Sequence, residues 1–164
     1  KILTIYEGTT AIQANDLVGR KTARDGGQTA KGIAAQVAET EAALVASGSA
    51  QALAVAKRLK AAREAFLDVV DFVAGKTKAE PNAVFAGSVP YLMLAGNLVA
   101  GWQLARSLRV AEEQLAAGVD TAFMQAKIAT AHFYAEHLLN KAPGIRDSIV
   151  DGAASVTALA LESF

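Results

Sequence analysis

The sequence contains no cysteine among its 164 residues. This absence excludes disulfide bonds and metal sites built from thiolates. It fits a reducing compartment, so we expect a cytoplasmic protein. Proline is also scarce, with three residues, and the chain is rich in alanine, which favours helix.

Net charge is the second feature that the sequence lacks. Lys and Arg number 16, Asp and Glu also number 16, and the isoelectric point is about 7.0. A balanced chain gives no electrostatic reason to expect nucleic acid or an anionic membrane as a partner. The hydrophobic fraction is 52% and the mean hydropathy is +0.26, so the chain has enough apolar residues for a sizeable core.

Segments that alternate polar and apolar residues with period two are absent too, whereas helical periodicity is widespread. Residues 30 to 47 and 50 to 75 both follow 4-3 spacing, and the second carries Val55, Leu59, Ala62, Phe66, Val69 and Val73 on one face. Gly48 is a plausible helix stop and Ser49 a plausible N-cap between them. The fold class predicted is all-α, an antiparallel bundle of about four long helices plus a short N-terminal helix.

The longest uncharged run extends from Ala83 to Leu104. Its length would suit a membrane span, but it contains polar residues, glycines and a proline and lacks asymmetric basic flanks. We interpret it as a central bundle helix and predict no membrane span. Pro90 is expected to kink or break this helix. Trp102 is expected in the core.

The C-terminal third predicts one more long helix and a short one. Asp120 is a candidate cap for the long helix, and Pro143-Gly144 is expected to end it. A short helix is predicted from Ile145 to Val150. The tail from Gly152 to Phe164 is expected to pack back on the bundle.

Three other patterns carry no predicted chemistry. Ala74-Gly75-Lys76-Thr77 resembles the end of a phosphate loop but has Val70 where that loop needs glycine. His132 and His137 are five residues apart and diverge around a helix, so we predict no metal site. The charged face from Lys57 to Asp71 is interpreted as solvated and linked by i,i+4 pairs.

A short stretch near the start combines a carboxylate, a glycine and two hydroxyls before a helix. It reads Ile5-Tyr6-Glu7-Gly8-Thr9-Thr10, and either threonine suits an N-cap. Gly19 is expected to end this helix, and Gly26-Gly27 to form a turn or hinge. On local physics alone, Glu-Gly-Thr before a helix is usually a turn and a cap.

The run from Ile5 to Gly27, I-Y-E-G-T-T-A-I-Q-A-N-D-L-V-G-R-K-T-A-R-D-G-G, resembles the closing segment of flavin-dependent acyl-CoA dehydrogenases. Its continuation N-D-L-V-G-R-K-T resembles the subgroup with an added C-terminal helical domain, which includes 3-methylmercaptopropionyl-CoA dehydrogenases. Residues 127 to 164 resemble the end of that added domain. We therefore expect a cut inside a longer polypeptide, with residues 1–26 as the tail of the catalytic domain and residues 27–164 as the helical bundle domain.

The resemblance implies specific roles. Glu7, in Y-E-G-T, would be the catalytic base, and Tyr6, Glu7 and Gly8 would contact the acyl-CoA substrate. Thr9 would contact FAD. Some members contact FAD through a glutamine two residues later, where this sequence has Ala11, and that contact is therefore not implied here.

The resemblance also implies partners for the parent enzyme: an acyl-CoA substrate, an electron acceptor and a homo-oligomeric assembly. The chain alone carries one catalytic residue, and we expect it neither to bind FAD nor to oxidise acyl-CoA. The alternative reading is a helical interaction or oligomerisation module without chemistry of its own.

Overall fold

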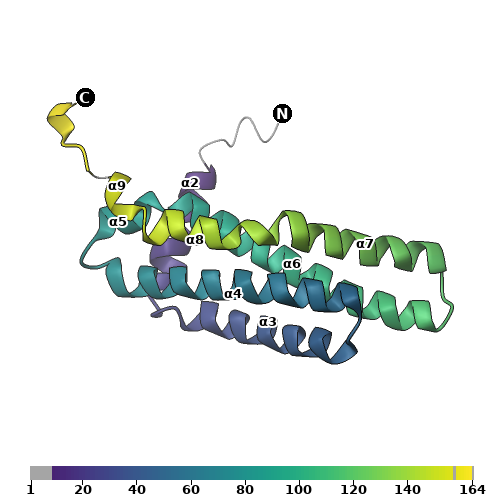
Figure 1. The fold of residues 1–164 in the computed structure, drawn as a ribbon. Coiled ribbons are helices and arrows are strands. Elements are labelled where there is room, and N and C mark those ends of the chain that lie inside the picture. Colours follow the sequence, from purple (N-terminus) through teal and green to yellow (C-terminus); the bar gives the residue numbers. More distant parts are fainter. Residues whose placement is uncertain (1–8, 157, 164) are drawn as a thin grey trace.

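The protein folds as a helical bundle, seen here in a computed structural model that describes residues 9–156 and 158–163. Four long helices form the bundle: α3 (Gln28–Ser47), α4 (Ala50–Lys76), α6 (Ser88–Ala116) and α7 (Thr121–His137). They run alternately in opposite directions, and α3 pairs with α4 while α6 pairs with α7 (Figure 1). The described residues contain helices and turns but no strand, which confirms the all-α prediction.

Shorter helices connect or follow the long ones. Helix α5 (Pro81–Ala86) joins α4 to α6, and η2 (Leu139–Lys141), α8 (Ala142–Val150) and α9 (Ala153–Val156) follow α7. The last turn, η3 (Leu161–Ser163), extends away from the bundle (Figure 1). The N-terminal helix α2 (Thr9–Asp16) continues into the π-helical segment η1 (Leu17–Ala23). Together α2 and η1 cross the long helices instead of running along them (Figure 1).

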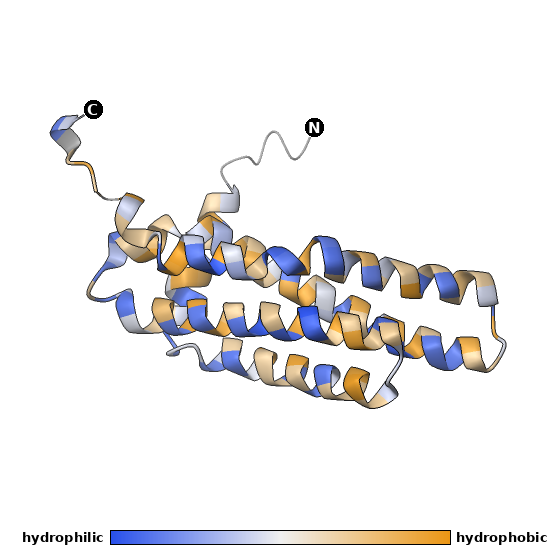
Figure 2. Ribbon diagram, in the orientation of Figure 1, coloured by the Kyte–Doolittle hydropathy of each residue, from blue (hydrophilic) through white to orange (hydrophobic). Residues whose placement is uncertain are grey.

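The core lies where α4 meets its neighbours. All six members of the predicted α4 stripe are buried, with Leu59, Ala62 and Val69 fully enclosed. Leu44 from α3 and Leu94, Leu98 and Leu108 from α6 complete the largest cluster. Each fully buried Leu or Phe contributes roughly 1.5–3 kcal/mol relative to an exposed one, so this shared stripe holds the bundle together. Figure 2 shows apolar residues, coloured orange, recurring along each of the long helices.

The predicted boundary between α3 and α4 is confirmed. Gly48 has a φ of 73°, the left-handed conformation that ends a helix. The Ser49 hydroxyl then accepts a hydrogen bond of 2.9 Å from the N–H of Ala52, which caps α4. The tight turn sets α3 and α4 antiparallel and side by side.

The predicted end of the first helix at Gly19 is wrong. The chain stays helical to Ala23, and the turn comes at Gly26 and Gly27, whose φ values are 66° and 80°. A Cβ built on Gly19 would lie 3.7 Å from the Phe85 ring. That distance is an ordinary van der Waals contact, so a small side chain would also fit between η1 and Phe85.

The uncharged run breaks just before Pro90, which is one of the two outcomes predicted, and α6 itself is not interrupted at Pro90. The break in the uncharged run falls at Gly87, between α5 and α6, and Pro90 occupies the first turn of α6. A first-turn N–H has no partner within the helix, so a proline there removes no helical hydrogen bond. None of the described helices is long and apolar enough to cross a membrane.

Two predictions about the C-terminal region are wrong. Pro143 and Gly144 lie in the first turn of α8 and begin that helix, while α7 ends earlier at His137. The tail does not pack back on the bundle beyond Ala153: its described side chains are exposed, Val156 to 66% and Leu159 to 65%. Asp120 occupies the predicted cap position of α7 with a φ of 35°, but its side chain makes no capping hydrogen bond.

Candidate functional site

The motif near the N-terminus lies at the edge of the described structure. Tyr6, Glu7 and Gly8 fall outside the described residues. Thr9 is the first residue of α2, and it is exposed. The structure therefore places the helix that follows the motif and one of the four predicted site residues.

A buried hydrogen bond between two hydroxyls fixes η1, and with it α2, on the bundle. The Thr22 Oγ1 atom lies 2.9 Å from the hydroxyl oxygen of Tyr91 in α6, and both residues are 1% exposed. The Tyr91 ring stacks on Phe66 of α4, with centroids 5.9 Å apart. Burial raises the pKa of Tyr91, so its hydroxyl stays protonated well above neutral pH. No local pattern in the sequence predicts this contact, because 69 residues separate the partners.

The carboxylate of Asp25 stabilises the turn that follows η1 by accepting hydrogen bonds from backbone N–H groups of the turn. The N–H groups of Gly27 and Thr29 donate to the two carboxylate oxygens of Asp25, at 2.9 and 3.0 Å. Hydrogen bonds from the Thr29 side chain and backbone hold the pKa of Asp25 below its ordinary value. The glycine pair therefore forms the predicted turn. A glycine pair can also bind phosphate through its backbone amides, but here Asp25 accepts from the N–H groups of Gly27 and Thr29.

A small apolar cavity of about 260 Å³ adjoins this attachment point. Its walls come from η1, α3, α4 and α6, and include Leu17, Ile33, Phe66, Tyr91 and Leu98. Lys21 and Thr29 also line it. The volume is below the range of pockets that take a drug-sized ligand, so it does not hold a cofactor as large as FAD.

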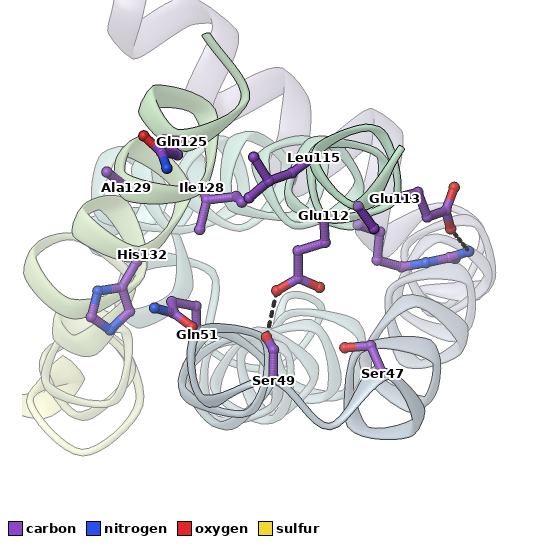
Figure 3. A pocket seen from close by; sticks show the side chains of 12 residues that line it. Ser47, Ser49, Gln51, Glu112, Glu113, Leu115, Gln125, Ile128, Ala129 and His132 are labelled. Carbon is purple, nitrogen blue, oxygen red and sulfur yellow. Dashed lines mark hydrogen bonds and ion pairs between the residues drawn. The ribbon is translucent and has the colours of Figure 1, made fainter. Parts of the chain in front are cut away.

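A larger cavity of about 830 Å³ lies between the α3–α4 turn, the end of α6 and the start of α7 (Figure 3). Glu112 points into it and accepts a hydrogen bond from Ser49, while Arg109 pairs with Glu113 at 3.7 Å. His132 and Gln51 face each other on one side (Figure 3).

This larger cavity lies far from the segment that follows the Y-E-G-T motif, and its residues do not form a catalytic site. Glu112 is 21 residues beyond Tyr91 along α6, so about 32 Å of helix separates the cavity from the Thr22 contact. The Ser49 hydroxyl caps α4 and donates to Glu112, and within the described part of the chain it makes no hydrogen bond to His132. The cavity presents polar walls but no nucleophile paired with a base.

The charged face of α4 connects helices instead of lying idle. The Lys60–Glu64 pair is the i,i+4 contact that the sequence predicts, at 3.8 Å. Four other residues reach across to neighbours: Arg58 to Glu136, Arg63 to Glu41, Asp68 to Arg146 and Asp71 to Lys31. Among the described residues no group of three or more His, Asp or Glu side chains is placed to hold a metal ion.

Comparisons with known proteins agree with the resemblance in the motif. Residues 29–160 match the family described as acetyl-CoA dehydrogenase C-terminal like. The chain is 48% identical over 161 residues to 3-methylmercaptopropionyl-CoA dehydrogenase of Ruegeria pomeroyi, covering 98% of this chain and 27% of that protein. It is 34% identical to the broad-specificity linear acyl-CoA dehydrogenase FadE5 of Mycobacterium tuberculosis, covering 91% of this chain and 26% of that protein.

The chain thus spans about a quarter of the length of these relatives. The family match covers α3 to α9, the whole of the bundle described above. The chain belongs to the acetyl-CoA dehydrogenase C-terminal-like family.

Proposed function

We propose that this chain is the C-terminal part of a flavin-dependent acyl-CoA dehydrogenase and supplies its catalytic base. The observation that carries the proposal is the 48% identity to 3-methylmercaptopropionyl-CoA dehydrogenase over 98% of the chain, together with the Y-E-G-T motif that begins at Tyr6. The relative with 34% identity is also an acyl-CoA dehydrogenase by name.

Glu7 is the base in this proposal. The carbon next to a thioester carbonyl is weakly acidic, so a carboxylate must be positioned to remove its proton. Burial beside an acyl chain raises the pKa of such a carboxylate toward working pH. The N–H of Glu7 would donate to the thioester carbonyl oxygen, where negative charge develops as the proton leaves. Tyr6 and Gly8 would line the substrate pocket.

Bound FAD would supply the acceptor for the hydride that leaves the neighbouring carbon. Among the described residues, the resemblance assigns a contact to this cofactor only to Thr9, the first residue of α2. Neither the 830 Å³ cavity nor the 260 Å³ cavity is lined by Thr9. The remaining contacts to FAD must therefore come from other parts of the parent polypeptide.

The division of the chain follows from this assignment. Residues 1–26 would be the tail of the catalytic domain, and residues 27–164 a separate helical bundle. The bundle contributes a stable platform, to which Thr22 and Tyr91 attach the segment that follows the motif.

Two preparations test the proposal. The full-length protein should be yellow and should reduce an artificial electron acceptor when acyl-CoA is added. The 164-residue chain should be colourless and helical and should leave FAD fluorescence unchanged. A full-length protein without acyl-CoA-dependent reduction, tested with short, medium and long thioesters, would favour the alternative of a helical interaction module.

A further inference from the structure

Burial in the core explains the lack of charge on only one face of α6, the helix that contains most of the uncharged run. One face of α6 packs in the core through Leu94, Leu98, Ala105 and Leu108. The opposite face is exposed along 4-3 spacing and carries Val89, Met93, Gly96, Ala100, Gln103, Ser107 and Val110. Met93 is 53% exposed and Val110 is 55% exposed. From Val89 to Gln103 this outer face of α6 is about 21 Å long and bears no charge. Beyond Gln103, Arg106 and Lys127 of α7 lie beside Ser107 and Val110.

The outer face of α4 shows the usual alternative. There Lys57, Lys60, Glu64, Asp68 and Asp71 are all exposed. The charges on α4 are explained by exposure to water and, for Asp68 and Asp71, by ion pairs with neighbouring helices. Exposure to water does not explain an exposed stretch of α6 of similar length that carries no charge.

Helix α2 extends the uncharged surface. It packs on α6, with Ala14 and, in η1, Val18 completely buried. Its own exposed residues from Thr9 to Gln13 and Asn15 carry no charge, and Ile12 is 64% exposed. Because α2 packs on α6, its uncharged exposed residues adjoin that helix.

We propose that the outer face of α6, together with α2, is the surface on which the catalytic body of the same polypeptide docks. The proposal rests on the proposed function, which puts residues 6 to 8 inside the active site of that body. The body must then touch the first turn of α2, and α2 lies on α6. The relatives are about four times as long as the part matched here, so such a body has the extent to cover both helices.

A covalently attached body is favoured over a second copy of the chain. The effective concentration of a tethered partner reaches the millimolar range for short linkers, so even a modest apolar contact stays closed. A second copy would have to reach the same side of α2 that the body already occupies at the motif.

Single cysteines in the full-length protein test the surface. The chain has none of its own, so Ala100→Cys introduces one on the outer face of α6, and Ala42→Cys introduces a matched one at an exposed alanine of α3. The rate of maleimide labelling is measured by peptide mass spectrometry, once in native buffer and once in denaturant. We expect Ala100→Cys to label at least about tenfold more slowly when native, and Ala42→Cys to show little protection.

Equal native labelling rates at the two positions would overturn the proposal. Protection of Ala100→Cys that disappears on dilution to monomer would overturn it too, because a second copy would then be the occupant. A second pair of variants guards against misfolding: Met93→Asp should lower the thermal midpoint of the full-length protein more than Val45→Asp, an exposed apolar residue of α3. Dehydrogenase activity is measured in parallel. If the protein is active but Ala100→Cys is not protected, only the docking proposal is rejected. If Ala100→Cys is protected but the protein is inactive, only the proposed function is rejected.

Discussion

The hydroxyl groups of Thr22 and Tyr91 meet at 2.9 Å inside the protein, and this contact joins the segment after the motif to the bundle. Thr22 belongs to η1 and Tyr91 to α6, so the hydrogen bond spans two parts of the chain that the proposed domain boundary at residue 26 separates. This buried polar pair, together with the buried side chains of Ala14 and Val18, therefore holds α2 and η1 on the bundle.

Replacing Tyr91 by phenylalanine should loosen this attachment. The Thr22 hydroxyl would stay buried without its partner, which costs about 1–2 kcal/mol. Amide exchange of residues 14 to 27 should accelerate more than that of α4. Tyr134→Phe is the control, because its half-buried hydroxyl makes a longer bond of 3.3 Å to the carbonyl of Asn97. Equal effects of the two variants on η1 exchange would refute the anchoring role.

The turn between η1 and α3 should distinguish its two glycines. Both have positive φ, so alanine at either position is strained by about 1–2 kcal/mol. A Cβ at Gly27 would lie 2.6 Å from Val70 Cγ1, whereas one at Gly26 meets nothing within 4 Å. Gly27→Ala should therefore destabilise the chain by about 1–3 kcal/mol more than Gly26→Ala. Chemical denaturation of both variants checks this difference, and equal midpoints would contradict it.

The ion pair between Glu41 and Arg63 should matter more than its surface counterparts. Arg63 donates from Nε and Nη2 to the two carboxylate oxygens at 2.8 and 2.9 Å, and the side chains are only 10% and 17% exposed for Glu41 and Arg63. Glu41→Gln leaves a largely buried guanidinium unpaired and should cost about 2–4 kcal/mol. Glu39→Gln, on the exposed side of the same helix, should change stability by less than about 0.5 kcal/mol. A difference below measurement error would show that solvent compensates Arg63.

The pair between Glu136 and Arg58 predicts a loss of stability in acid. Hydrogen bonding from Arg58, at 2.8 Å from Nη2, holds the pKa of Glu136 below its ordinary value. A lowered folded pKa stabilises the protein above the unfolded pKa, and this stabilisation is lost as pH falls through the folded pKa. Thermal melts between pH 7 and pH 3 should show Glu136→Gln less stable than wild type at neutral pH and converging with it in acid. Parallel curves over that range would contradict the assignment.

Much of the fold follows from the sequence. The 4-3 stripe of α4 from Val55 to Val73, the Gly48 stop and the Ser49 cap are local signals, and local signals are sufficient for them. Pro143 is predicted to end a helix but begins α8, and Pro90 likewise lies in the first turn of the helix that follows the break. Proline signals a helix boundary, but only the surrounding packing decides whether it ends one helix or begins the next.

The site was less accessible to such reasoning. The roles of Tyr6, Glu7, Gly8 and Thr9 come from resemblance, because a carboxylate followed by glycine and threonine is equally a helix cap. The Thr22–Tyr91 contact and the ion pairs of Arg58 and Arg63 join residues far apart in the sequence, and nothing in the local pattern specifies them. The uncharged run showed that α6 is unusual, but not that one of its faces is exposed.

The measurement that tests the central claim most directly is the rate at which acyl-CoA reduces the flavin of the full-length protein carrying Glu7→Gln. The variant keeps the shape of the side chain and removes the base, so FAD should bind and reduction should slow by about 10²–10⁴. Glu39→Gln, an exposed carboxylate on α3, should reduce its flavin at the wild-type rate. Flavin reduction near the wild-type rate in a flavin-loaded Glu7→Gln protein would contradict the account.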